Sequence, residues 1–219
     1  MELLIESASS FAKDIDNLIL TIAVMTGFWL LLAEGILIYF CVKYRKKNNP
    51  KAAYITGEKH HEKKWIHIPH NAVLVCDLVV IVFAIIVWVK IKQDLPTPDE
   101  TIRVVGQQWS WTIVHPGLDK KLGTEDDVHT VDEIRLKVGK TYHFKLQATD
   151  VMHSFSVPVF RLKQDAIPGR EITGWFKPTK TGEYDLQCAE MCGIGHGIMR
   201  GRVHVESEAD HIKWLKSKS

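Results

Sequence analysis

Hydrophobic residues are distributed very unevenly along this chain. The run LILTIAVMTGFWLLLAEGILIYFCV over 18–42 contains a single charged residue, and so does the run IPHNAVLVCDLVVIVFAIIVWV over 68–89. Each run is long enough to cross a hydrocarbon layer of about 30 Å as a helix. The first run is too long for the apolar part of a signal peptide. The pattern therefore predicts two retained transmembrane helices, and a buried soluble helix is disfavoured because each run is apolar around most of its circumference.

The hairpin over 43–64 between these runs is strongly basic, with eight Lys and Arg residues against two Glu. Positive charge marks the cytoplasmic side of a membrane protein and also favours contact with lipid headgroups. We therefore expect a multi-pass protein of the inner (cytoplasmic) membrane, with the N-terminus and everything after Val89 on the periplasmic, outer side. A few polar residues inside the spans are expected to face a partner subunit or a water path rather than lipid. They are Glu34, His70, Asn71 and Asp77.

From Thr101 onward the pattern changes to short runs rich in Val, Ile, Thr and aromatic residues, several of them alternating with period two. Turn residues separate these runs, which favours an antiparallel sandwich or barrel. The tail over 207–219 has helical spacing, and Ser207 is placed to cap it. We expect a transmembrane hairpin over 1–95, a β domain over 96–206 and a C-terminal helix over 207–219. The net charge of +2 gives no reason to expect nucleic-acid binding.

The stretch CAEMCGIGHGIM places Cys188, Cys192, His196 and Met199 within twelve residues. Two thiolates, an imidazole and a thioether favour copper over zinc, because methionine is a poor zinc ligand. A disulfide between the cysteines is the simpler alternative on an oxidising side of the membrane, but it would leave the histidine and methionine without a role. Blue-copper sites add one histidine from an earlier strand, and His153 is the candidate. The two thiolates could bridge a pair of metal ions, with a backbone carbonyl of the loop as a further weak donor.

Four motifs in order, GQQWSW, VMHSFSVP, DAIPGR and CAEMCGIGHGIM, together with the two spans resemble subunit II of the haem-copper cytochrome c oxidases. The resemblance covers nearly the whole chain. It implies an α+β membrane protein, in which a two-helix transmembrane hairpin precedes an all-β cupredoxin-like Greek-key sandwich. It also implies a proton-pumping enzyme of the respiratory chain. Electrons would pass from cytochrome c, through a dinuclear copper centre called CuA, to haem in subunit I, where oxygen becomes water.

The resemblance also implies roles for individual residues. The copper ligands would be the residues His153, Cys188, Glu190 (through its carbonyl), Cys192, His196 and Met199. The Glu190 side chain would face a magnesium ion shared with subunit I, and Trp109 would be the electron entry point. Asp165 and Arg170 match residues near the subunit I interface and the proton exit. Glu62 matches an acid at the mouth of a proton path on the inner side.

Each of these roles has a simpler alternative. Trp109 could fill a surface of the sandwich, Asp165 and Arg170 could stabilise a turn, and Glu62 could be a solvated charge. The densest acidic stretch of the outer domain could steer a basic cytochrome or could be a solvated loop. It consists of Asp119, Glu125, Asp126, Asp127, Asp132 and Glu133.

Other classes of protein share parts of this pattern. Membrane-anchored copper chaperones carry a similar cysteine pair, but on a domain of alternating helices and strands. A tethered structural domain with zinc or a disulfide, a quinol oxidase subunit and a nitrous-oxide reductase each fit fewer of the motifs. The chain has no motif for covalent haem attachment, so haem is expected only in the partner subunit. The expected partners are subunits I and III, other oxidase subunits and a c-type cytochrome donor.

Overall fold

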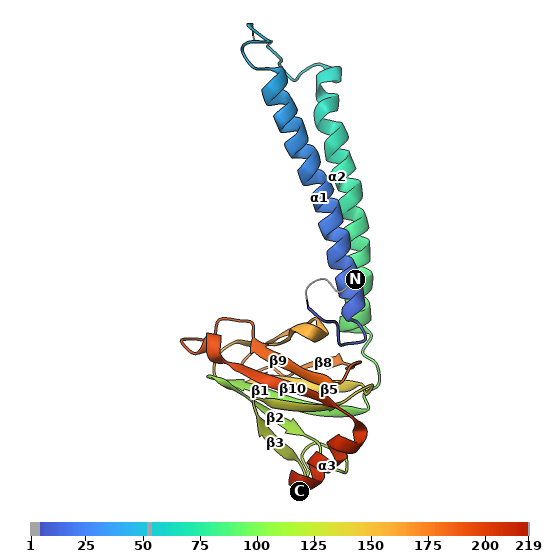
Figure 1. Ribbon diagram of the computed structural model, residues 1–219, viewed down its shortest axis with the longest axis vertical. Helices are drawn as coiled ribbons and strands as arrows, with labels where there is room; N and C mark the ends of the chain where they lie inside the picture. Colours follow the sequence, from blue (N-terminus) through green and yellow to red (C-terminus); the bar gives the residue numbers. More distant parts are fainter. Residues whose placement is uncertain (1–4, 52–53, 219) are drawn as a thin grey trace. The chain divides into compact units, whose positions relative to one another are not determined.

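The computed structural model describes residues 5–51 and 54–218, and the chain divides into two compact units (Figure 1). One unit, Asp16–Trp88, holds most of the two long helices. The other contains the described residues up to Ile15 together with the chain from Val89 onward. The described residues 5–15, which the sequence analysis grouped with the transmembrane hairpin, therefore belong to the unit that contains the strands, called the β unit below.

The two apolar runs form the helices α1 (Ala12–Lys43) and α2 (His60–Trp88), and α2 continues as a π-helical turn over Val89–Gln93. Ala12–Lys43 and His60–Gln93 are both long and apolar enough to cross a membrane. The predicted spans over 18–42 and 68–89 lie inside these ranges. The helices extend beyond the spans because polar residues at their ends continue the same backbone hydrogen bonding outside the hydrocarbon layer.

The β unit is a sandwich of two five-stranded sheets with the strand orders β3-β2-β1-β5-β8 and β4-β10-β9-β6-β7. The strands of the first sheet are β1 (Glu100–Gln107), β2 (Ser110–His115), β3 (Val128–Val131), β5 (Tyr142–Ala148) and β8 (Ile172–Phe176). Those of the second are β4 (Glu133–Lys137), β6 (His153–Val157), β7 (Leu162–Ala166), β9 (Gly182–Cys188) and β10 (Arg200–Glu206). Alternate side chains of most strands point into the core, as in β5, whose burial alternates strictly.

The prediction of a sandwich is confirmed, but the expectation that it is antiparallel is wrong for two strand pairs. β1 lies parallel to β5, with Ile102 opposite Phe144, and β10 lies parallel to β4, with Val203 opposite Ile134. Parallel pairing arises because the chain crosses repeatedly between the sheets, after β3, β4, β5, β7 and β8. The strands of these two pairs are neighbours in a sheet without being consecutive in sequence, and alternation within one strand carries no information about its neighbour.

The segment before α1 is anchored to the sandwich. The Ala8 amide donates to the Val159 carbonyl (2.8 Å), and the Thr179 amide donates to the Ala8 carbonyl (2.9 Å). The Phe11 ring is 1% exposed and packs edge-on against Trp175 at 5.1 Å. Because these contacts are made by a short irregular segment, hydropathy alone gives no sign of them.

The C-terminal helix α3 (Glu208–Lys218) closes one end of the sandwich, and the predicted cap is confirmed by the Asp210 amide donating to Ser207 Oγ (3.2 Å). The Trp214 ring packs at 5.1 Å from the ring of His115 on β2 and at 5.3 Å from that of His211. Both histidines are 2% exposed. The helix is therefore held by contacts that include two buried imidazoles.

Burial lowers the pKa of both histidines. Desolvation, reinforced by the neighbouring His211, lowers the pKa of His115 to about 3. Desolvation and the positive charges of Lys137 and Arg135 lower the pKa of His211 to about 4. The Glu206 carboxylate, 3.1 Å from His211 Nδ1, is already shared with Arg135 and does not reverse this shift. Both imidazoles are thus neutral in the folded protein at neutral pH.

We expect α3 to loosen in acid. The unfolded chain binds protons at its histidines below about pH 6.5, whereas the folded chain resists them. This contribution to the free energy of unfolding is complete above pH 6.5 and is lost as the pH falls towards 3. The loss should be on the order of 3 kcal/mol for each imidazole between pH 7 and pH 4. Hydrogen exchange of the α3 amides measures it, and His115→Phe combined with His211→Gln should flatten the dependence. The exposed His129→Gln is the control, and an unchanged slope in the double variant would disprove the assignment.

Candidate metal centre

The predicted ligand loop lies at one end of the sandwich, away from α3 (Figure 1). β9 and β10 form the antiparallel pair that carries it, and the Cys188 amide donates to the Met199 carbonyl (3.0 Å) at its base. β6 is the other neighbour of β9, with Phe155 opposite Cys188. His153, the first residue of β6, therefore comes to the same end of the sheet as the loop.

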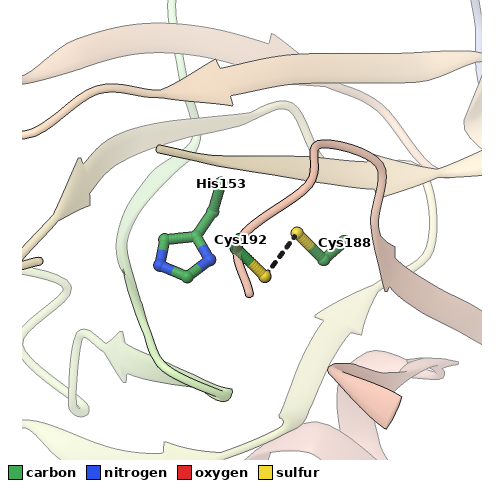
Figure 2. Close-up of side chains that lie close together, drawn as sticks. All are labelled: His153, Cys188 and Cys192. Carbon is green, nitrogen blue, oxygen red and sulfur yellow. Dashed lines mark hydrogen bonds between the residues drawn. The ribbon is translucent and has the colours of Figure 1, made fainter. Parts of the chain in front are cut away.

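Three of the predicted ligands form a buried cluster. Ligand atoms of His153, Cys188 and Cys192 all lie within 4.8 Å of one another. The three residues are 0%, 8% and 3% exposed, respectively. Figure 2 shows the imidazole and the two sulfur atoms gathered at one point, with the sulfurs 3.8 Å apart. The sheet register thus brings together residues that are far apart in the sequence.

The remaining predicted ligands surround this cluster. Met199 Sδ lies 3.8 Å and His196 Nδ1 3.7 Å from Cys192 Sγ. The Glu190 carbonyl oxygen lies 3.2 Å from Cys188 Sγ. Every donor that the sequence singled out is therefore present within contact distance of one of the two sulfurs.

The two cysteines are free thiols, since their sulfurs are 3.8 Å apart whereas a disulfide requires about 2.05 Å. Burial and the neighbouring Cys188 raise the pKa of Cys192 to about 11. Two adjacent thiolates in this environment therefore need a positive charge beside them, and a bound cation supplies it. The chemistry of the pair fits a metal better than a disulfide.

The orientation of His153 supports the same conclusion. Its Nδ1 atom is buried without a hydrogen-bond partner, whereas its Nε2 atom lies 2.9 Å from Asp150 Oδ1. A buried polar atom without a partner is costly, and a metal ion would satisfy it. Metal-binding histidines commonly donate their second ring nitrogen to a carboxylate in this way. The residues present therefore fit a copper centre.

The turn between β1 and β2 covers the loop and carries Trp109. Gln108 Nε2 donates to the Cys192 carbonyl at 2.7 Å, and Trp109 Nε1 lies 3.3 Å from the same oxygen. The indole is 40% exposed, so it reaches both the surface and the ligand loop. Gly195 lies directly under it, because a Cβ there would come 2.3 Å from Trp109 Cδ2.

Two residues of the site, Asp150 and Gln108, were not selected from the sequence. The Asp150 carboxylate accepts hydrogen bonds from the Gln108 amide (2.7 Å) and the Val151 amide (2.6 Å) besides contacting His153. Partial burial opposes its ionisation, but these hydrogen bonds outweigh the burial and lower the pKa of Asp150. Gln108 lies within the quoted motif GQQWSW and Asp150 directly precedes VMHSFSVP, and an acid three residues before a candidate histidine ligand is the signal that could have identified Asp150.

The structure also gives the positions of Glu190, Asp165 and Arg170, whose roles remain predictions. The Glu190 side chain is half-buried at the edge of the loop. Asp165 lies on β7, opposite Ser154 of β6. Arg170 is exposed, in a turn closed by its own amide donating to the Ile167 carbonyl (3.1 Å).

Glu62 and the acidic stretch also have identifiable structural settings. The Glu62 carboxylate accepts hydrogen bonds from the amides of Gly57 (3.0 Å) and Lys59 (3.4 Å), which caps the start of α2.

The acidic residues between Asp119 and Asp127 follow the end of β2 that is opposite to Trp109. Six strand residues separate the two ends, about 20 Å. The structure therefore does not bring this part of the acidic stretch to the ligand loop.

Comparison with known proteins shows the family of this chain. Residues 100–206 match the family model for the cytochrome c oxidase subunit II periplasmic domain. An alternative cytochrome c oxidase subunit 2 of Bradyrhizobium diazoefficiens is 31% identical over 214 residues, covering 88% of this chain and 76% of that protein. The chain belongs to the cytochrome c oxidase subunit II family. A probable subunit 2 of Rickettsia bellii is 32% identical over 203 residues, covering 87% of this chain and 74% of that protein.

The solved periplasmic domain of subunit II from Bradyrhizobium japonicum has the same fold. It matches with a TM-score of 0.50 and 30% identity, covering 57% of this chain and 96% of that one. The prediction of a cupredoxin-like sandwich after two apolar helices is thereby confirmed. As a subunit II, the chain is a membrane protein with a periplasmic-type domain and works within a larger oxidase that includes a subunit I. The chaperone and structural alternatives have no support from these relatives.

Proposed function

We propose that this subunit II is the electron-entry subunit of a proton-pumping oxidase and holds a dinuclear copper centre of the CuA type. Its ligands are the side chains of His153, Cys188, Cys192, His196 and Met199, with the carbonyl of Glu190. When bound at these residues, a copper pair would supply a one-electron centre that reorganises little between its two redox states. The observation that carries the proposal is the convergence of the four other donors on the two buried cysteine sulfurs.

The protein's own residues prepare this site. Asp150 holds the ring of His153 with Nδ1 directed into the cluster, so the imidazole is oriented before metal binds. Burial of both cysteines excludes water from the thiolates. Trp109, half-exposed and in contact with the Cys192 carbonyl, is the proposed entry point for the electron from cytochrome c. In the proposed function, haem in subunit I would be the next acceptor of this electron, and oxygen would be reduced to water there.

Further roles belong to the same proposal. The Glu190 side chain, beside the ligand loop, is proposed to face a magnesium ion shared with subunit I. Asp165 and Arg170 are proposed to lie near the subunit I interface, where protons leave, and Glu62 to lie at a proton entry on the inner side. Subunit III, other oxidase subunits and lipid of the inner membrane are the proposed neighbours of the helices.

Metal analysis combined with electron paramagnetic resonance tests the proposal on the full chain in detergent, loaded with copper. We expect two coppers per chain and a hyperfine pattern shared over both nuclei. A single localised copper, bound zinc or an unreactive disulfide would show that the loop does not hold the proposed copper pair. The full chain is used because the segment before α1 packs against the sandwich.

A further inference from the structure

A groove lies between α1 and α2, within the unit that holds the two long helices. Its volume is about 610 Å³, far more than the roughly 30 Å³ that one water molecule occupies. Its walls are mostly apolar, with Trp29 on α1 and Val73 and Val80 on α2 among the lining side chains. The carboxylate of Asp77 also lines it. An occupant must therefore suit both apolar walls and an acidic group.

Asp77 lies at the middle of the apolar helix. The stretch long enough to span a membrane is His60–Gln93, in which 17 residues precede Asp77 and 16 follow it. At 1.5 Å per residue each end is about 25 Å away, and the hydrocarbon layer is about 30 Å thick. The apolar run over 68–89 is centred close to the same residue. The carboxylate therefore lies near the middle of the membrane, out of reach of the lipid headgroups on either side.

The rest of the hairpin gives Asp77 no counter-charge. Among the described residues, its carboxylate has no hydrogen bond and no ion pair. Neither 18–42 nor 68–89 contains a Lys or Arg. The hydroxyl of Thr26, which lines the same groove, donates to a carbonyl of its own helix at 2.8 Å. His70 lies seven residues earlier on α2, about 10 Å along the helix axis. The partner of Asp77 therefore comes from outside this chain.

Lipid, water and a second copy of this chain each lack what the groove requires. A carboxylate inside the hydrocarbon layer is costly unless it is paired. Lipid tails carry no donor, and a second copy would bring the same two spans without Lys or Arg. Water needs two to four polar partners, which walls such as Val73 and Val80 do not offer. A different polypeptide with a cation at this depth supplies the missing charge.

We propose that the groove is the docking site for a transmembrane helix of another subunit of the oxidase, and that this helix places a Lys or Arg side chain beside Asp77. The inference goes beyond the proposed copper centre and does not depend on it. Apolar contact gives little preference for protein over lipid in a membrane, because lipid tails are as apolar as the groove walls. The ion pair supplies that preference, and it also fixes the depth at which the helices meet.

Photocrosslinking of the complete oxidase in native membranes identifies the occupant. The photoreactive residue benzoylphenylalanine replaces Val80, which lines the groove, or the adjacent Val79, which is 53% exposed and does not line it. From residue 80 we expect a crosslink to a transmembrane peptide of another subunit, with a Lys or Arg within about one helical turn of the crosslinked position. Residue 79 should not give this product. Crosslinks from residue 80 only to lipid, to a quinone, to a second copy of this chain or to a helix without such a cation would overturn the inference.

Variants of Asp77 test the ion pair itself. Asp77→Leu leaves the partner's cation without a counter-charge, so the share of partner that stays bound during extraction in mild detergent should fall at least about tenfold. Asp77→Glu keeps the charge and should keep most of the partner bound. The matched control is Glu34→Leu, which removes an acid from the other span, outside the groove, and should leave the partner bound. An immunoblot of this chain in the membrane checks that each variant is produced and inserted.

An exchange of charges separates pairing from folding. Asp77→Lys should release the partner, because two cations then face each other in the groove. Changing the partner's crosslinked cation to Asp in the same cells should restore most of the binding. A loss that this exchange does not reverse, or equal losses in Asp77→Leu and Glu34→Leu, would show that Asp77 does not pair with a docked helix.

Discussion

Cys188→Ser is expected to abolish electron entry from cytochrome c while leaving the sandwich folded. The two sulfurs are 3.8 Å apart and are the atoms on which all the other donors converge. A serine hydroxyl is a harder and less ionised ligand, so it cannot bridge a copper pair. We expect turnover with a cytochrome c donor to fall by at least about 100-fold. A loss of this size is typical when a group that is required for the reaction step is removed.

Folding is checked separately from activity. Cys188 ends β9, and its amide bonds to the Met199 carbonyl, a contact that serine keeps. Near-ultraviolet circular dichroism should therefore match the unaltered protein. Cys41→Ser is the matched control, because this cysteine is exposed on α1, outside the β unit, and should leave turnover and copper content unchanged. Normal turnover in the Cys188→Ser oxidase would rule out the copper pair as the electron-entry site.

Trp109→Phe is expected to slow electron entry far more than it weakens donor binding. Phenylalanine keeps an aromatic surface but loses the indole Nε1, which lies 3.3 Å from the Cys192 carbonyl. The polar contact between the ring and the Cys192 carbonyl of the ligand loop is then lost. We expect kcat to fall on the order of 100-fold, as small misplacements at a reacting centre do, with a change of KM below about threefold.

A substitution at Gly195, which lies under the indole, tests the position of the ring while residue 109 remains tryptophan. A Cβ at Gly195 would come 2.3 Å from Trp109 Cδ2, so Gly195→Ala must displace the ring. Gly197→Ala in the same loop is the control, because a Cβ there has nothing within 4 Å. In the Trp109→Phe background, Gly195→Ala should have little further effect, which shows coupling between the two positions. Equal losses in KM and kcat for Trp109→Phe would indicate a packing role instead.

The parts of this protein that could be predicted from the sequence depend on residues close together in the chain. The apolar runs that became α1 and α2, the strand-like runs and the cap at Ser207 are each visible within a few residues. The ligand loop was recognisable because four soft donors lie within one short stretch. Its metal preference follows from the donor atoms alone, whatever the fold around them.

The contacts between distant residues were settled only by the tertiary structure. Strand alternation gave no sign that β1 and β5 are parallel, because alternation does not depend on a strand's neighbour. The acidic stretch was a candidate surface for steering a cytochrome, yet most of it follows the end of β2 that is opposite to Trp109.

The sequence by itself determined the two apolar helices, the all-β domain, the family and the types of donor atom in the loop. Sheet register decided the rest, since it brings Gln108 to the Cys192 carbonyl and Phe155 opposite Cys188. The physical reason is that hydropathy and donor chemistry are properties of single side chains and short segments. Orientation, burial and the surroundings of a site arise only when strands from different parts of the chain pack side by side.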